Sequence, residues 1–90
     1  MSLYYAAHVT IAAPLAAERA KLMSTLGAAE SFAPSSGDTL TGRGANSVEL
    51  IRRMQRLIQE LKKNSFTLRR YQVEDTMVDS RNKDVYGLLP

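Results

Sequence analysis

Apolar and polar residues alternate through the first segment of the chain, and this spacing of two is typical of a β-strand. The alternation runs over residues 3–11. Successive side chains of a strand point to opposite faces, so one face carries Tyr5, Ala7, Val9 and Ile11. The other face carries Tyr4, Ala6, His8 and Thr10. We expect Pro14 to open a helix, because the first helical turn does not need the N–H that proline lacks.

The segment Leu15–Leu26 places its apolar residues at helical spacing. One side of this helix is formed by Leu15, Leu22, Met23 and Leu26. Gly27 follows, and we expect it to end the helix in the left-handed conformation that glycine adopts most easily.

The segment Ser47–Lys63 has the same periodicity over a longer stretch. Its apolar side is formed by Leu50, Met54, Leu57, Ile58 and Leu61. Asn46 with Glu49 three residues later predicts a helix cap, and Ser47 is the alternative capping residue. We expect Asn64 to take the left-handed conformation after the last turn.

Three further strands are predicted between and after the helices. Ser31–Ala33 and Thr39–Thr41 flank a turn and predict a short hairpin, after which Gly42-Arg43-Gly44 leads into the second helix. The last strand is predicted over Phe66–Ser80. One face of it carries Arg69, Tyr71, Val73, Asp75 and Met77. The other face carries Leu68, Arg70, Gln72, Glu74, Thr76 and Val78.

This order of elements, β-α-β-β-α-β, is typical of a ferredoxin-like α/β sandwich. In this α+β fold one antiparallel sheet carries both helices on one face, and the first and last strands are neighbours. We expect a single domain over residues 1–90, because a chain of 90 residues supports one small core. The C-terminal tail over residues 81–90 ends in apolar residues that could dock on the domain or on a partner.

The sheet face that the helices leave open collects the polar chemistry of the sequence. We identify His8, Thr10 and Glu74 as candidate catalytic groups, since Glu74 could orient the imidazole of His8. The candidate binding residues on this face are Tyr4, His8, Thr10, Arg43, Arg70, Gln72 and Glu74. An ordinary solvent-exposed sheet face explains the same pattern, and the sequence leaves both interpretations open.

Composition excludes several classes of site. The chain has no cysteine, which excludes disulfides, thiol nucleophiles and cysteine-ligated metals, and its single histidine disfavours a zinc site. No apolar run approaches the roughly 18 residues of a membrane span, and the N-terminus lacks a signal-peptide pattern, so a cytoplasmic location is the default expectation. The net charge of +3 permits an anionic partner without requiring one. We expect no cofactor and no metal.

Three weaker patterns have a structural interpretation beside a functional one. Arg52, Arg53 and Arg56 could contact phosphates, although a solvated helix face is the favoured interpretation. Gly42-x-Gly44 before a helix looks like a phosphate loop but lacks the other residues of one. The acidic residues of the last segment could bind a divalent ion, but their spacing matches no standard loop; they are Glu74, Asp75, Asp79 and Asp84.

Two motifs lie near opposite ends of the chain. They are Tyr4-Tyr5-x-x-His8-Val9-Thr10-Ile11 and Arg70-Tyr71-x-x-Glu74-Asp75-Thr76-x-x-Asp79-Ser80-Arg81, with Thr41-Gly42 between them. Together they resemble a group of small uncharacterised bacteriophage and bacterial proteins. Those proteins often have a histidine after the Thr-Gly pair, where this chain has Arg43. The resemblance implies a short phage-type protein of unknown activity.

The triplet His8-Val9-Thr10 also resembles the motif of the two-histidine phosphoesterases. In that family two ferredoxin-like lobes each supply a His-x-Thr/Ser motif, and this chain has one copy. The resemblance therefore implies half of such an enzyme. A homodimer would have to pair two His8 and Thr10 sets, with one imidazole as base and the other as acid on a phosphodiester.

These observations lead to three functional hypotheses. The leading one is a non-enzymatic host-interaction module that binds a host or phage macromolecule, with a protein favoured over a nucleic acid, through the open sheet face and the apolar tail. The second is a dimeric phosphoesterase or nucleotide-binding protein that uses His8 and Thr10. The third is a weak RNA binder that uses Tyr4, His8 and the arginines of the sheet.

Overall fold

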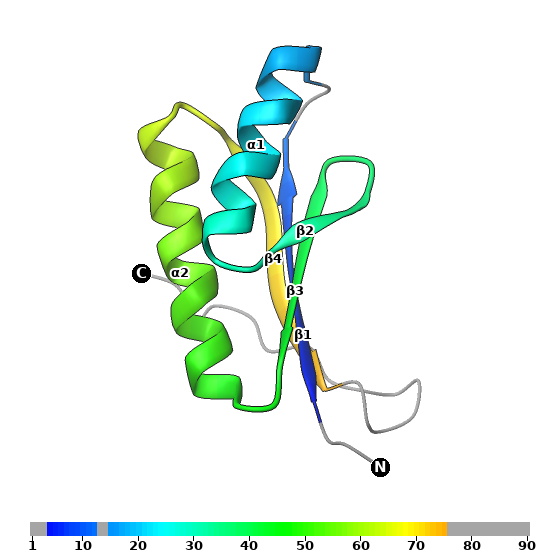
Figure 1. Cartoon of the computed structure of the whole chain (residues 1–90), viewed down its shortest axis with the longest axis vertical. Helices are drawn as coiled ribbons and strands as arrows, with labels where there is room; N and C mark the ends of the chain where they lie inside the picture. The colour runs from blue at the N-terminus through cyan, green and yellow to red at the C-terminus, as the bar shows by residue number, and fades with distance from the viewer. Residues whose placement is uncertain (1–3, 13–14, 76–90) are drawn as a thin grey trace.

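The fold joins four strands and two helices in the order that the sequence predicts. The computed structural model describes residues 4–12 and 15–75. Its elements are β1 (Tyr5–Ile11), α1 (Ala17–Ala29), β2 (Ala33–Ser36), β3 (Thr39–Gly44), α2 (Ser47–Lys63) and β4 (Leu68–Asp75), as Figure 1 shows. The strands form one antiparallel sheet in the order β2-β3-β1-β4. This is the ferredoxin-like α+β arrangement, so the predicted fold class is confirmed.

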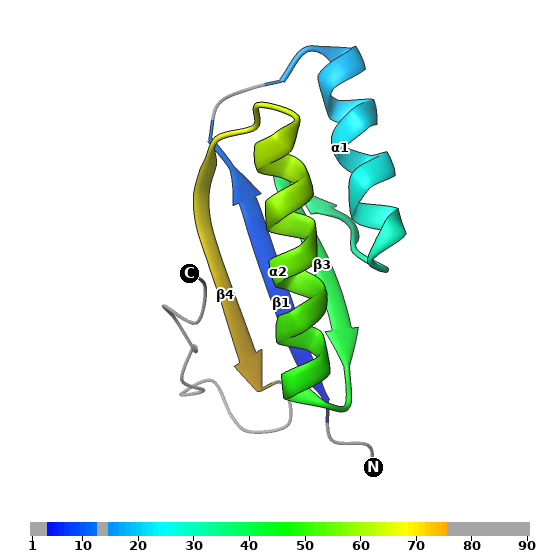
Figure 2. The same ribbon diagram turned by 90° about the vertical axis from the view of Figure 1, so that its left-hand side faces the viewer.

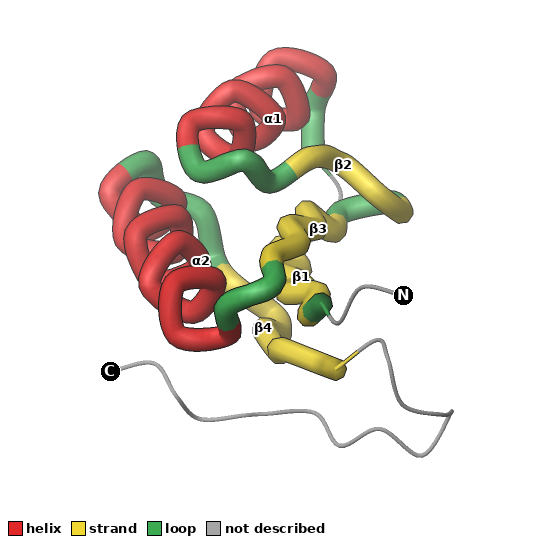
Figure 3. Tube along the Cα trace, turned by 60° about the horizontal axis from the view of Figure 1, so that its bottom comes forward, coloured by secondary structure: helices red, strands yellow, loops and turns green. Residues whose placement is uncertain are grey.

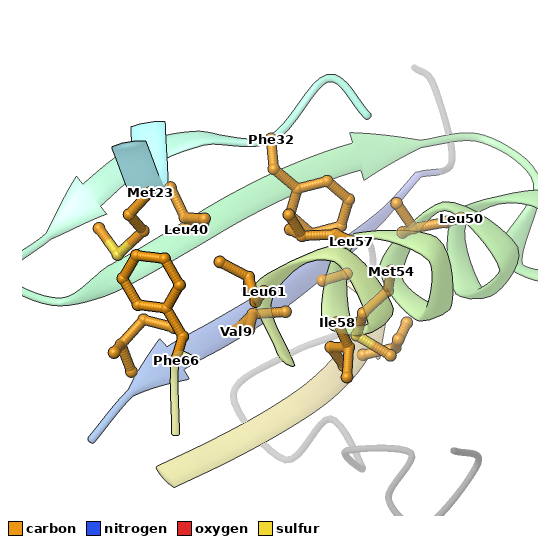
Figure 4. Packing of buried hydrophobic residues seen from close by; sticks show 13 residues of the cluster. Val9, Met23, Phe32, Leu40, Leu50, Met54, Leu57, Ile58, Leu61 and Phe66 are labelled. Carbon is orange, nitrogen blue, oxygen red and sulfur yellow. The ribbon is translucent and has the colours of Figure 1, made fainter. Parts of the chain in front are cut away.

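Both helices cover one face of the sheet and leave the other face open, as Figure 3 shows. In Figure 2, α2 runs along the sheet in front of β1, while α1 lies beside it toward β2 and β3. The apolar side of α2 is buried as predicted, through Leu50, Met54, Leu57, Ile58 and Leu61. Figure 4 shows Leu61 beside Val9 of β1 and between the rings of Phe32 and Phe66, with Leu50, Met54 and Ile58 farther along α2. We call the sheet face away from the helices the open face.

The first helix begins and ends later than predicted. It starts at Ala17, and Leu15 packs against the core from outside the helix. Gly27 is a buried residue inside α1, so the expectation that it ends the helix is wrong. A Cβ at Gly27 would lie 2.9 Å from the carbonyl oxygen of Phe32, so the residue is glycine because the chain after the helix returns very close to it. The left-handed conformation falls instead on Ser31, with φ of 61°. Pro14 lies outside the described residues.

The hairpin of β2 and β3 also differs from its prediction. Strand β2 covers Ala33–Ser36, so Pro34 and Ser35 are strand residues, although their composition predicted a turn. The turn is formed by Gly37 and Asp38. Strand β3 continues to Gly44 rather than ending at Thr41. Phe32 explains the longer strand, because its ring packs on the backbone at Gly42, where a Cβ would lie 2.7 Å from the ring. Gly42 and Gly44 are therefore strand residues, and the superficial likeness to a phosphate loop fails.

Strand β4 is shorter than predicted and contains an irregularity. Thr10 pairs with Arg70 and Ile11 pairs with Leu68, so Arg69 is an extra residue in β4. This bulge turns Leu68 toward the core, whereas strict alternation predicted it on the open face. Phe66 is buried before the strand begins. The predicted part of the strand after Asp75, including Met77 and Val78, lies outside the described residues, as does the tail over residues 81–90.

The boundaries of α2 agree with the prediction. The side chain of Asn46 accepts a hydrogen bond from the backbone N–H of Glu49 at 3.1 Å, so Asn46 rather than Ser47 is the cap. The left-handed residue after the helix is Ser65, with φ of 65°, and Asn64 has a negative φ, so that expectation was one residue early. Over the residues that the structure describes, neither helix has the length and hydropathy needed to cross a membrane.

Candidate functional site

His8 lies in the middle strand pair of the open face. In the strand register it is opposite Thr41 of β3 on one side and Gln72 of β4 on the other. Its neighbours along β1 on the opposite face, Ala7 and Val9, are fully buried under the helices. The alternation that buries these two residues therefore fixes the direction of the imidazole toward the open face.

A chain of hydrogen bonds crosses all four strands through His8. Nδ1 of His8 lies 2.9 Å from Oγ1 of Thr41, and that hydroxyl donates to Oγ of Ser35 in β2 at 2.8 Å. On the other side, Nε2 of His8 lies 3.1 Å from a carboxylate oxygen of Glu74 in β4. An ionised carboxylate only accepts hydrogen bonds, so Nε2 is the donor in that contact. We call Ser35, Thr41, His8 and Glu74 the cross-strand network.

The hydroxyl of Thr41 joins the two halves of this network. Ser35 donates to the carbonyl oxygen of Thr39 at 3.3 Å, which leaves its oxygen to accept from Thr41. The same Thr41 hydroxyl lies 2.9 Å from Nδ1 of His8, so it links Ser35 to the imidazole. Thr41 is only 6% exposed, so its hydroxyl depends on these protein partners.

Thr10 is engaged in a separate contact. Its hydroxyl lies 2.8 Å from the hydroxyl of Thr39, its register partner in β3. His8 and Thr10 therefore share a face, as predicted, but each forms its hydrogen bonds with side chains of neighbouring strands. The hydroxyl of Thr10 bonds to Thr39 rather than to the imidazole, so the two groups are joined through the sheet and not to each other.

The open face is hollowed beside His8. The hollow has a volume of about 320 Å³ and is lined by His8, Thr10, Thr39, Arg70, Gln72 and Glu74. The side chains of His8 and Glu74 are 25% and 33% exposed, so both reach solvent from its floor. The lining combines a guanidinium, a carboxylate, an imidazole, hydroxyls and an amide, which suits mixed polar contacts rather than one sign of charge.

Five of the seven predicted site residues line this hollow, and two do not. Arg43 is exposed and lies opposite Ala6, which separates it from Glu74 in the same row of the sheet. Tyr4 precedes β1, is 37% exposed and is absent from the lining. These two residues flank the candidate site instead of forming it.

Two polar residues of the site were not predicted. Thr39 lines the hollow, and Ser35 ends the network. A correct register between β1 and β3 would have revealed Thr39, since it lies directly opposite Thr10. Ser35 carried no such signal, because its segment has the composition of a turn.

The weaker sequence patterns do not form further sites. Arg53 donates to three backbone carbonyls, those of Glu30, Ser31 and Arg43, at 3.0, 3.3 and 3.1 Å. Arg56 pairs with the carboxylate of Glu30 at 3.0 Å. These contacts join α2 to the end of α1 and to β3, so this part of the arginine stripe serves the fold. Within residues 4–12 and 15–75, no group of three or more acidic or histidine side chains could hold a metal ion; Asp79 and Asp84 lie outside that part.

No protein-family model, curated protein sequence or solved structure matches this chain.

Proposed function

We propose that the chain is a non-enzymatic binding module whose open sheet face docks on a macromolecular partner. The observation that carries this proposal is the cross-strand network, which bonds the polar side chains of four strands to one another. Side chains held in this way lose little freedom on binding, so the ordering cost of docking is low. An open, shallow and already ordered surface suits a broad macromolecular contact.

The bonding of His8 supports recognition over catalysis. A general base needs an unshared electron pair within reach of the substrate proton, and a general acid needs a proton directed at the leaving group. Both ring nitrogens of His8 are instead directed along the sheet, at Thr41 and Glu74. The imidazole therefore acts in this proposal as the centre that orders the face.

The mixed charge of the face supports a protein partner over a nucleic acid. Binding to a phosphate backbone draws its affinity from concentrated positive charge. The hollow is lined by the carboxylate of Glu74 as well as the cation of Arg70, and Arg53 and Arg56 are bonded within the fold. The resemblance to small phage-type proteins agrees with this proposal, and the expected partner is a host or phage protein met in the host cytoplasm.

Site-specific photo-crosslinking tests the proposal. A benzophenone amino acid is placed at Thr39 or Arg43 on the open face, or at the exposed Gln59 or Lys62 on α2 as matched controls. After irradiation in the cells from which the chain comes, we expect one protein adduct from both open-face positions and none from the helix. Equal adducts from both surfaces, or adducts from the helix alone, would refute the proposed face.

A nucleotide-binding protein is the second candidate function, and the lining of the hollow favours it. Arg70 and the hydroxyls of Thr10 and Thr39 are groups that bind phosphates, although the carboxylate of Glu74 opposes an anion there. Linear and cyclic nucleotides should be screened by calorimetry and for turnover with the wild-type, His8→Ala and Thr10→Ala chains. Turnover that both substitutions abolish would replace the binding-module proposal with the phosphoesterase hypothesis.

A further inference from the structure

The outer edge of β4 is a second surface with a specific character. The sheet ends at this strand, and β1 is its one strand partner among the described residues. An unpaired strand edge offers rows of backbone N–H and C=O groups to another strand. The opposite edge, β2, is short and carries Pro34, which blunts it. Strand β4 has 8 residues, more than any other strand in the sheet, and carries no proline.

The charges along β4 have opposite signs on the two sides of its middle residue. Its sequence from residue 69 is Arg-Arg-Tyr-Gln-Val-Glu-Asp, with the basic residues before Gln72 and the acidic residues after it. Running the strand backwards therefore exchanges positive charge for negative charge. A strand with this property complements a second copy of itself in the antiparallel direction.

We propose that two copies of this chain pair through β4, antiparallel, about a two-fold axis at Gln72. Arg70 then lies opposite Glu74 of the partner subunit, and the symmetry forms this pair twice. Tyr71 lies opposite Val73 of the partner subunit, also twice, on the helix side of the sheet. Opposite charges and aromatic or β-branched residues are favourable directly across antiparallel strands.

Alternative pairings lose this complementarity. A parallel pair in register would place Arg70 beside Arg70 of the partner subunit and Glu74 beside Glu74 of the partner subunit, and like charges directly opposite are unfavourable. Moving the axis to Tyr71 would place Glu74 opposite the apolar Leu68 of the partner subunit, so the pairs of opposite charge would be lost. The bulge at Arg69 ends regular pairing on one side, so the predicted interface is centred on residues 70–74.

This dimer would have one sheet of eight strands with all four helices on one side, since an antiparallel two-fold pair keeps both copies facing the same way. Glu74 would lie between His8 of its own chain and Arg70 of the partner subunit, so the network would continue across the axis. His8 and Gln72 share a row, so the two His8 residues would be three strand spacings apart, about 14 Å. Each imidazole is also held by Thr41 and Glu74 of its own chain, so this dimer does not bring the two rings together on one phosphate.

Pairing through β4 is independent of the proposed binding function of the open face. It replaces the paired-histidine dimer with a different interface, and it would stand if photo-crosslinking found no partner. A contact limited to one strand edge is small, so we expect a dissociation constant on the order of 10 μM.

A single cysteine at the axis tests the pairing directly. Antiparallel neighbours lie about 4.5–5.5 Å apart at Cα, within disulfide range, and the chain has no cysteine of its own. At 100 μM under mild oxidation, we expect Gln72→Cys to form a covalent dimer rapidly and Gln59→Cys, exposed on α2, to form it slowly. Equal rates, or a faster rate for Gln59→Cys, would overturn the proposal.

Charge reversal tests the same interface by a route that needs no covalent bond. Sedimentation should show that Arg70→Glu and Glu74→Arg each weaken the dimer by on the order of 30-fold, because each creates two like-charged pairs. An equimolar mixture of these two variants should dimerise again, because each then faces opposite charge. A wild-type chain that remains monomeric at several hundred micromolar, or a mixture that remains monomeric while circular dichroism shows both variants folded, would overturn the proposal.

Discussion

At the scale of single residues, Gly42 decides how closely Phe32 can pack on the sheet. The ring of Phe32 is fully buried against this glycine, and a Cβ there would lie 2.7 Å from two ring carbons. An aromatic ring between a helix end and a sheet has no room to retreat in a packed core.

We therefore expect Gly42→Ala to lower the free energy of unfolding by about 1–3 kcal/mol, measured by urea titration. Gly44→Ala is the matched control in the same strand, because its Cβ would meet the flexible end of the Arg53 side chain at 3.2 Å and the Cβ of Leu50 at an ordinary contact distance of 3.8 Å. That control should lose less than about 1 kcal/mol. Equal losses for both variants would show that the contact with Phe32 is not the cause.

Most residues of the site could be predicted at this scale, and the residue predictions that failed have physical causes. Alternation along β1 correctly placed His8 and Thr10 on one face, because a strand buried on its other face has no freedom of register. Alternation failed at Leu68, because the bulge at Arg69 adds a residue that no pattern of polarity announces. Gly27 was misassigned because a glycine that ends a helix and a glycine that permits close packing look alike in sequence.

At the scale of elements, Arg53 joins three parts of the chain. Its guanidinium donates to carbonyls at the end of α1 and in β3, and it lies 5.7 Å from the ring centre of Phe32. The carbonyls of Glu30 and Ser31 lie just after the last residue of α1, where no further helical turn supplies N–H partners. Arg53 therefore fixes the packing of the two helices on the sheet.

We expect Arg53→Met to destabilise the fold by about 1–3 kcal/mol in thermal or urea unfolding, because methionine keeps the apolar stem but none of the donors. Arg52→Met is the control at the preceding residue. Arg52 is exposed, and its ion pair with Glu49 is long, at 3.9 Å. We expect a change within about 0.5 kcal/mol for that variant. Similar losses at both positions would refute a specific role for Arg53.

The helices and strands were predicted in the right order but with uneven accuracy at their ends. The apolar stripe and the cap of α2 predicted that helix well, because local signals and tertiary packing agree there. The hairpin was displaced because Pro34 and Ser35 have turn composition and yet pair with β3 at the edge of the sheet. An edge strand tolerates proline, so composition alone could not separate the strand from the turn.

At the scale of the whole molecule, the candidate site exists only once the sheet has formed. Its network takes Ser35, Thr41, His8 and Glu74 from four strands, and His8 and Glu74 are 66 residues apart in sequence. The sequence predicted His8 and Glu74 together because the fold makes the first and last strands neighbours. It could not predict that Thr41 and Glu74 would hold both ring nitrogens, since this depends on the exact pairing of three strands.

His8 is bonded on both sides within the network, and we propose that it orders the open face. The most direct test is the ¹⁵N spectrum of the His8 ring, the one histidine of the chain, in the wild type and in Thr41→Val. We predict that Nε2 keeps its proton and its shift in both chains, because Glu74 can only accept from it, while the Nδ1 shift changes when the hydroxyl is removed. Identical ring spectra in the two chains, or a proton on Nδ1 with Nε2 unprotonated, would show that Thr41 and Glu74 do not hold the His8 ring in this way.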